Sequence, residues 1–272
     1  MESSTQTLVL VAEDHVVNQK VVSLLLSSLG IGGEIVSTGK AAVEAASAKT
    51  YALILMDIMM PEMDGFQASF KIRQREFKFG RHTPIVACTA MDEDHVRDQC
   101  IRAGIDDFIQ KPLSKSVLQM KIEKWTRIKI SPLPSKPGAD IKAKRLADLV
   151  VESLDPIDRG SLSMLYGLEQ LDDIMVLYQS VTESLLGQLE SGIKRQDVML
   201  VGRMAHEIKG SSYAVSAREM ASVCLALEQA GEHQNWPEVE RLYASLGLAF
   251  ARVEAYLADN QRMVHRLRDQ AS

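Results

Sequence analysis

The two halves of this chain carry different hydrophobic patterns, and this contrast constrains the fold more than any other feature. Up to about residue 128, short apolar runs alternate with amphipathic stretches of helical periodicity. Beyond residue 140 only helical periodicity remains. Between the halves, Ser131–Gly138 holds three prolines and a glycine, which cannot continue a helix and predict a semi-rigid linker. We therefore expect a domain over residues 1–129, a proline-rich linker over 130–140 and a second domain over 141–272.

The first half predicts an α/β fold. Its apolar runs have the length of buried strands, and a helical pattern follows each one. The strands are expected at Leu8–Ala12, Glu34–Val36, Tyr51–Met56, Pro84–Ala87 and Asp107–Ile109. The helices are expected at Val16–Leu29, 38–49 (capped by Thr38), 65–76, 92–103 and 114–128. Nearly continuous apolar strands that alternate with helices are typical of a parallel sheet covered on both faces. We predict a flavodoxin-like, doubly wound, five-stranded parallel sheet.

The second half predicts an all-α antiparallel bundle. Long amphipathic patterns separated by short loops favour helices that reverse direction at each turn. They are expected at 171–193, 198–215, 218–231 and 237–267, and Pro237 suits the first turn of the last one.

Composition excludes several classes of protein. The chain has 272 residues, 46% of them hydrophobic and 25% charged, which is typical of a globular protein of two domains. The net charge of −5 argues against a nucleic-acid-binding surface, and no apolar stretch is long enough to span a bilayer. The N-terminus does not resemble a signal peptide, and the three cysteines are too widely spaced for a disulfide framework or a zinc site. We expect a cytoplasmic protein with buried thiols, tethered when it is part of a larger membrane-bound protein.

Polar side chains cluster where the predicted strands end. Glu13 and Asp14 follow the first strand, Asp57 ends the third, Thr89 follows the fourth and Lys111 follows the fifth. The carboxyl ends of parallel strands meet at one edge of the sheet, where ligands bind. Crowded carboxylates repel one another and favour a divalent cation, Mg²⁺ or Mn²⁺. An aspartate nucleophile at Asp57, with an ammonium and a hydroxyl beside it, suits phosphoryl transfer.

Each of these residues alone has an ordinary structural explanation, since acidic pairs start helices and aspartates end strands at turns. Their joint order resembles the receiver domain of response regulators in bacterial two-component systems, over about residues 7–126. The resemblance implies that Asp57 is the phosphorylated residue. It also implies the metal ligands, which are Asp14, Asp57, the main-chain carbonyl of Met59 and, through water, Glu13.

The same resemblance implies further roles. Thr89 and Phe108 occupy the coupled switch positions, and a switch at Phe108 works by packing alone because the ring lacks a hydroxyl. Lys111 and Pro112 are expected to share a cis peptide bond. Asn18 fits a pattern found in receivers fused to hybrid sensor kinases. A haloacid-dehalogenase-type phosphatase also uses a nucleophilic aspartate, but it requires a second aspartate where this chain has Met59.

A second motif, Ala205-His206-Glu207-Ile208-Lys209-Gly210-Ser211-Ser212, lies in the helical half. Because His206 and Lys209 are three residues apart, they share a helix face, and Lys209 can neutralise an arriving phosphoryl group. A glycine inside a helix costs about 1 kcal/mol, so Gly210 suggests room for a partner beside the imidazole. Ser211 and Ser212 are candidate hydroxyl donors. A zincin-type metal site is excluded, because it requires a histidine at position 210.

A single histidine on a helix is usually only a surface or core residue, but this motif resembles the phosphohistidine site of a histidine phosphotransfer (HPt) domain. Residues 221–231 resemble the helix that follows it in that family. Tyr213 and its neighbours depart from the family's pattern. We expect this departure to affect which partner protein binds rather than whether His206 is phosphorylated. The remaining histidines lie among polar neighbours and are expected to be solvated; they are His15, His82, His95, His233 and His265.

Together the two motifs predict a phosphorelay intermediate, in which Asp57 and His206 exchange phosphate with a sensor histidine kinase or with other receivers. The chain lacks the ATP-binding domain of a kinase, so we expect a phosphotransfer module rather than an enzyme, either independent or the C-terminal part of a hybrid sensor kinase. No nucleic acid or membrane insertion is expected. Two alternatives stay open: a phosphorylation-controlled binding switch, and a phosphatase that draws phosphate from a partner.

Overall fold

The computed structural model describes residues 8–89, 93–111, 113–130, 155–158, 162 and 168–269. The chain divides into two compact units, Met1–Asp140 and Ile141–Ser272, which we describe separately. Most of the predicted linker lies outside the described residues.

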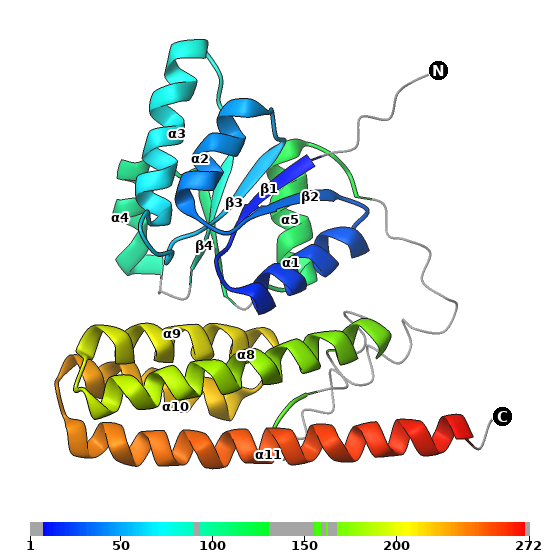
Figure 1. Cartoon of the computed structure of the whole chain (residues 1–272). Coiled ribbons are helices and arrows are strands. Elements are labelled where there is room, and N and C mark those ends of the chain that lie inside the picture. Colours follow the sequence, from blue (N-terminus) through cyan, green and yellow to red (C-terminus); the bar gives the residue numbers. More distant parts are fainter. Residues whose placement is uncertain are drawn as a thin grey trace. The chain divides into compact units, whose positions relative to one another are not determined.

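The first unit is built on a five-stranded parallel sheet of order β2-β1-β3-β4-β5 (Figure 1). The strands are β1 (Leu8–Ala12), β2 (Gly32–Val36), β3 (Leu53–Asp57), β4 (Ile85–Thr89) and β5 (Asp107–Gln110). This order is that of flavodoxin-like folds, so the predicted fold class is confirmed. The sheet edge formed by the ends of β1, β3, β4 and β5 carries the predicted acceptor site.

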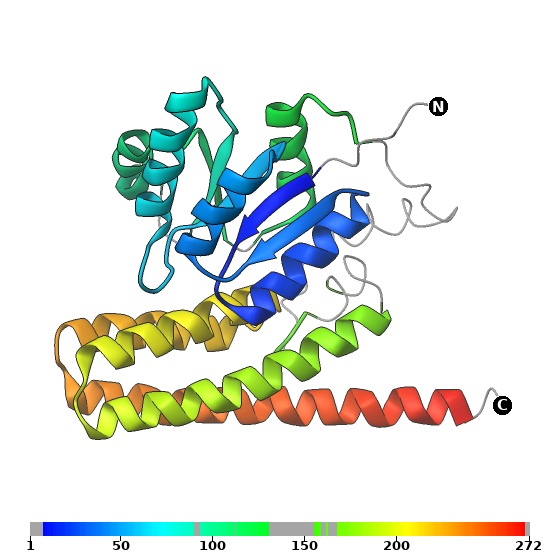
Figure 2. The ribbon, with the colours of Figure 1, turned by 45° about the horizontal axis from the view of Figure 1, so that its top comes forward.

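Helices cover both faces of the sheet (Figures 1 and 2). They are α1 (Val16–Ser28), α2 (Gly39–Ala48), α3 (Gly65–Phe79), α4 (Glu93–Ala103) and α5 (Lys115–Thr126). Alternate strand residues such as Leu10 and Ile54 form one core cluster with residues of α2, α3 and α4. The views place α1 and α5 together on the opposite face. Because both faces are covered, the strands can be apolar throughout.

Side-chain caps fix where several helices begin. The Thr38 hydroxyl accepts from the Ala41 amide at 3.1 Å, and the Asp64 carboxylate accepts from the Gln67 amide at 2.7 Å. The cap predicted at Thr38 is thereby confirmed. At its other end, α3 continues to Phe79, beyond the predicted end, and stops at Gly80, whose φ of 61° is left-handed.

The second unit is a bundle of long helices. They are α8 (Leu168–Lys194), α9 (Val198–Ala214), α10 (Arg218–Glu232) and α11 (Trp236–Asp269). Successive helices run in opposite directions, joined by the short segments 195–197, 215–217 and 233–235 (Figure 1). The predicted antiparallel bundle is confirmed. Cys224 is buried here, and Cys88 and Cys100 are buried in the first unit, which agrees with the expectation of buried free thiols. Within the described part of the chain, no helix combines the length and apolarity needed to cross a membrane.

Candidate functional site

The ends of β1, β3 and β5 bring an ammonium group between two carboxylates. Lys111 Nζ donates to Glu13 Oε2 at 2.7 Å and to Asp57 Oδ2 at 2.6 Å. The three side chains are nearly buried, with 12%, 3% and 7% of their surface exposed for Lys111, Glu13 and Asp57. Glu13, Asp14 and Asp57 each offer a carboxylate oxygen, and these oxygens lie within 4.8 Å of one another. The structure therefore gathers residues that are far apart in the sequence into one anionic cluster.

Main-chain contacts explain why these residues converge. The Glu13 amide continues the β1–β2 ladder to the Val36 carbonyl at 3.0 Å, and the Lys111 amide donates to the Thr89 carbonyl at 2.7 Å. Beyond Asp57, the Gly65 amide donates to the Ile58 carbonyl at 3.0 Å. A Cβ atom at Gly65 would lie 2.2 Å from the Asp57 carbonyl oxygen, so only glycine permits α3 to begin this close to the end of β3.

Burial and charge shift the ionisation of the cluster. Burial, reinforced by the Glu13 charge, raises the pKa of Asp57 to about 7, although Lys111 opposes this. Burial also acts to raise the pKa of Glu13, but the Lys111 ammonium and the Asn18 amide hold it below its usual value. The pKa of Lys111 is raised by its two carboxylate partners against the effect of burial. The cluster thus holds one ion pair, between Glu13 and Lys111, in which both groups are charged. The negative charge of the second carboxylate, Asp57, is not fully neutralised, because the two carboxylates share one ammonium group.

Residues at the start of α1 hold Glu13 in place. Asn18 Nδ2 donates to Glu13 Oε1 at 2.9 Å, and the His15 amide approaches the same oxygen at 3.3 Å. The expectation that His15 is solvated is wrong, because it is only 8% exposed and neither ring nitrogen has a partner among the described residues. Burial lowers the pKa of His15 to about 4, so the ring is neutral. His15 precedes the first turn of α1, and that position packs it inside the edge of the site.

The other predicted receiver residues lie on β4, on β5 and directly after β3. Thr89 ends β4 and is buried. The Met59 amide donates to Asp57 Oδ1 at 3.1 Å, and the Met59 side chain is 50% exposed at the site. Phe108 packs against the core cluster of α2, α3 and α4, and Lys121 Nζ lies 5.5 Å from its ring centre. Pro112 lies outside the described residues, so the cis peptide remains a prediction.

In the second unit, His206 belongs to a hydrogen-bonded triad with Lys209 on α9 and Glu228 on α10. Its Nδ1 lies 3.0 Å from Glu228 Oε1, and Lys209 Nζ donates to the other oxygen of the same carboxylate. Burial acts to raise the pKa of Glu228, but the hydrogen bonds from His206 and Lys209 bring it below its usual value. Because an ionised carboxylate can only accept, the imidazole must donate from Nδ1. In the neutral ring the lone pair then lies on Nε2, the nitrogen away from Glu228, and the His206 side chain is 30% exposed.

The two serines that follow are not placed as expected. Both are fully buried, so the prediction that they are donors at the histidine is wrong. The Ser211 hydroxyl donates to the Glu207 and Ile208 carbonyls, each at 3.1 Å. Ser212 Oγ lies 2.8 Å from the hydroxyl of the buried Tyr178 on α8. Helical periodicity explains the difference, since residues five and six beyond His206 point into the bundle rather than along the histidine face.

Sequence reasoning missed the role of Glu228. It lies in the segment 221–231 that we had matched to the following helix, but no local motif marks it. The available signal was indirect: α10 must pack antiparallel on α9, and the buried Lys209 needs an acidic partner from that helix. The placement of Gly210 on α9 agrees with the prediction, while its proposed role in partner access is not tested by these contacts.

Comparison with known families identifies both units. Residues 9–123 match the family model of the response regulator receiver domain, and residues 173–270 match that of the Hpt domain. The chain is a receiver domain followed by an Hpt domain. The two matches cover the acidic cluster and the histidine triad respectively, and a receiver joined to an Hpt domain fits a phosphorelay intermediate.

Curated relatives match most of this chain and are much longer proteins. The chain is 28% identical over 256 residues to the sensor protein GacS of Pseudomonas syringae, a match that covers 93% of this chain and 28% of that protein. It is 26% identical over 235 residues to the signal transduction histidine-protein kinase BarA of Escherichia coli, covering 84% of this chain and 24% of that protein. The chain thus spans about a quarter of the length of these relatives.

Solved structures are similar to part of the chain. One is the magnesium-containing receiver domain of the sensor histidine kinase PA1611 from Pseudomonas aeruginosa, at 36% identity and a TM-score of 0.42, covering 46% of this chain and 100% of that one. Another is the co-crystal structure of Saccharomyces cerevisiae Ypd1 with the receiver domain of Ssk1, at 28% identity and a TM-score of 0.43, covering 46% of this chain and 92% of that one.

Proposed function

We propose that the protein carries phosphoryl groups between Asp57, His206 and partner proteins in a phosphorelay. The observation that carries this proposal is that an aspartate and a histidine, both candidate phosphoryl acceptors, each have charged side chains positioned beside them. Asp57 has Lys111 and the acidic cluster, and His206 has Glu228 and Lys209. We further propose the domain limits given above, with residues 130–140 as the linker.

At the receiver, the proposed step is attack by an Asp57 carboxylate oxygen on the phosphorus of a donor phosphohistidine. An O–P bond forms, the N–P bond breaks, and the donor imidazole keeps the electron pair. Lys111 is placed to move its ammonium toward the arriving phosphoryl oxygens, since it already contacts Asp57 Oδ2. Thr89 is the proposed hydroxyl donor, and Phe108 the proposed packing switch.

The acidic cluster fits a bound divalent cation, since three carboxylates face one ammonium group. Glu13, Asp14, Asp57 and the Met59 carbonyl are the proposed ligands of Mg²⁺, or of Mn²⁺. When bound, the cation supplies positive charge for the phosphoryl oxygens. The carboxylates also exclude an incoming dianion until their charge is balanced, so uptake depends on that balance.

At the Hpt domain, the Nε2 lone pair of His206 is the proposed nucleophile toward an aspartyl phosphate. The N–P bond forms, the O–P bond to the aspartate breaks, and the carboxylate is regenerated. Glu228 holds the Nδ1 proton and stabilises the positive charge that develops on the ring. The reverse sequence uses the same atoms, so the triad serves uptake and release alike.

The proposed partners are a sensor histidine kinase and further receivers, in keeping with the names of the relatives GacS and BarA. Receiver and Hpt domains are phosphotransfer modules, so they take their phosphate from such a kinase, whether it belongs to the same protein or to another. Because those exchanges use ATP-derived phosphate, we place the chain in the cytoplasm, alone or within a longer hybrid kinase.

Phosphate tracking on the full chain tests the proposal. The parent, Asp57→Ala and His206→Ala chains are labelled with a small-molecule phosphodonor and with a phosphorylated kinase or receiver, and intact mass locates the label. A relay predicts label at Asp57 that needs a divalent cation, and label at His206 that moves to an added receiver.

Other outcomes would reject the relay. Label that appears at Asp57 and ends only as free phosphate, with none passing through His206, would favour the phosphatase. Label at Asp57 that changes partner binding without reaching His206 would favour the binding switch. Equal labelling of Asp57 with and without EDTA would show that phosphate uptake there does not require a metal ion.

A further inference from the structure

Helix α3 exposes an unusual set of aromatic side chains. The chain has six phenylalanines, and three of them lie on the outer side of this helix. Phe70 is 50% exposed, Phe77 is 90% exposed and Phe79 is 74% exposed. Scattered apolar residues on a surface need no explanation, but a cluster of large ones marks an interaction site.

The exposed charges along α3 itself are all of one sign. Between residues 65 and 82 the exposed charged side chains are Lys71, Arg75, Lys78 and Arg81, while the single acidic residue, Glu76, is buried and paired with Arg73. The whole chain, by contrast, has a net charge of −5. The α3 face, which we define as Phe70, Lys71, Arg75, Phe77, Lys78 and Phe79, is therefore aromatic and cationic on an acidic protein.

The exposed rings stand on a firmly held helix end. Arg73 donates to the Gly104 carbonyl at 2.8 Å, to the Thr83 carbonyl at 2.9 Å and to Asp106 at 2.6 Å. The Arg81 amide donates back to the Glu76 carbonyl at 3.1 Å and closes the last turn. Because the inner side of α3 is fixed by these contacts, the exposure of Phe77 and Phe79 does not result from fraying.

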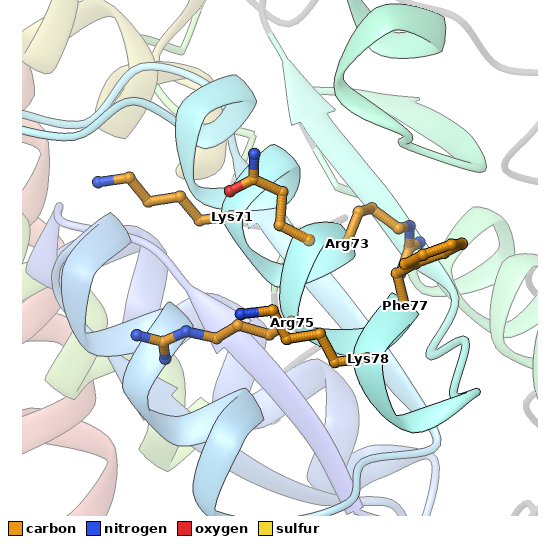
Figure 3. Close-up of a pocket in the computed structure, with 6 residues that line it drawn as sticks. Lys71, Arg73, Arg75, Phe77 and Lys78 are labelled. Atoms are coloured by element: carbon orange, nitrogen blue, oxygen red, sulfur yellow. The ribbon is translucent and has the colours of Figure 1, made fainter.

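Figure 3 shows how the face is arranged. The long side chains of Lys71, Arg75 and Lys78 extend to one side of the helix, and the Phe77 ring lies on the other. A hollow of about 860 Å³ runs over this surface between Lys71 and Lys78. Phe77 and Phe79 are two residues apart, so they leave the helix in different directions.

We propose that the α3 face binds the surface of a membrane that contains anionic lipids. Because Phe77 and Phe79 stand at the C-terminal end of α3 and leave it in different directions, one groove of a folded partner does not hold both rings, whereas a fluid lipid surface takes up the helix end with both. The basic side chains beside them complement phospholipid headgroups. The proposal is independent of phosphotransfer, since none of these residues belongs to either acceptor site.

Co-sedimentation of the full chain with vesicles tests the proposal. The vesicles contain phosphatidylcholine alone, or phosphatidylcholine mixed with phosphatidylglycerol. We expect binding only to the anionic vesicles, and weaker binding as salt is raised. Each basic residue near such a surface strengthens binding about fivefold. Replacing two of them, in Lys71→Glu with Lys78→Glu, should therefore weaken binding by about 25-fold or more. Phe77→Ser with Phe79→Ser should weaken it about tenfold or more.

Matched variants control for charge and for folding. Lys40→Glu with Lys129→Glu changes the net charge equally at exposed positions outside α3, and Leu248→Ser removes an exposed apolar side chain from α11. Both should bind vesicles within about twofold of the parent, and all variants should take up phosphate at Asp57 as the parent does.

Three outcomes would overturn the proposal. They are equal vesicle binding by the parent and by the α3 variants, an equal loss of binding in the matched controls, and binding to a single-stranded oligonucleotide or to an acidic polypeptide in place of vesicles. The phosphate-uptake measurement keeps these results separate from any failure of the relay itself.

Discussion

Replacement of Glu228 by alanine should slow phosphorylation of His206 without removing any atom that touches phosphate. Glu228 accepts the hydrogen bond from His206 Nδ1 at 3.0 Å and so places the reactive lone pair on Nε2. Without it, the ring can rotate, and the proton can move to Nε2, the nitrogen that has to attack. Loss of the carboxylate also removes the charge that balances a developing imidazolium.

The size of the effect follows from the contacts. A hydrogen bond to a charged group contributes about 1.5–3 kcal/mol, which corresponds to a rate about 10- to 100-fold slower for Glu228→Ala. Glu228→Gln keeps an acceptor for Nδ1 but only a neutral one, so a loss of about fivefold is expected. Both variants leave Lys209, which is 7% exposed, without its charged partner. The free energy of unfolding of the bundle should therefore fall by about 2–3 kcal/mol.

The assay is single-turnover transfer from a phosphorylated receiver to the full chain, at a temperature where every variant is shown to be folded. Glu232→Ala is the matched control, because this exposed glutamate lies one turn from Glu228 on α10. Nitrogen NMR of the imidazole provides a second, rate-independent measurement: the parent should carry its proton on Nδ1, and Glu228→Ala should shift it toward Nε2.

Two results would refute this reasoning. If folded Glu228→Ala is labelled at the rate of the parent, the carboxylate does not assist the histidine. If the rate falls but the ring nitrogens keep their protonation, the effect comes from loosened packing and not from the position of the proton.

Three further predictions concern lifetime, stability and the buried serines. Met59→Asn should speed the loss of phosphate from Asp57 in the isolated first unit, because an amide can orient water where an exposed thioether cannot; unchanged decay would place water access elsewhere. Asp107→Asn should lower the free energy of unfolding by about 2 kcal/mol at neutral pH, since hydrogen bonds from two lysines and a tryptophan hold the pKa of this carboxyl below its usual value. That contribution is present above the unfolded pKa of about 4 and is lost as pH falls, so thermal unfolding of parent and variant should converge in acid, and a constant gap would contradict the assignment. Ser212→Ala should cost about 1 kcal/mol of stability and leave His206 labelling unchanged; slower labelling at unchanged stability would restore the serine as a donor.

Much of the architecture follows from local pattern. Apolar runs of strand length determined a parallel sheet, and the end of helical periodicity at the prolines determined the division of the chain. The acidic cluster was also predictable, since the order of Glu13, Asp57 and Lys111 along the strands places them at one edge whatever the exact packing. In these cases the decisive interactions are short-range or depend only on the order of strands.

Tertiary structure decided which neighbours complete each site. Nothing local marks Glu228 as the partner of His206, because that contact depends on how α10 lies against α9. Burial could not be predicted either: His15 was expected in solvent and is enclosed, while Phe77 lay just beyond the end of the predicted helix and is almost fully exposed on α3. Periodicity tells which residues share a face of a helix, but only the packing of the helix on the rest of the fold determines which face is covered.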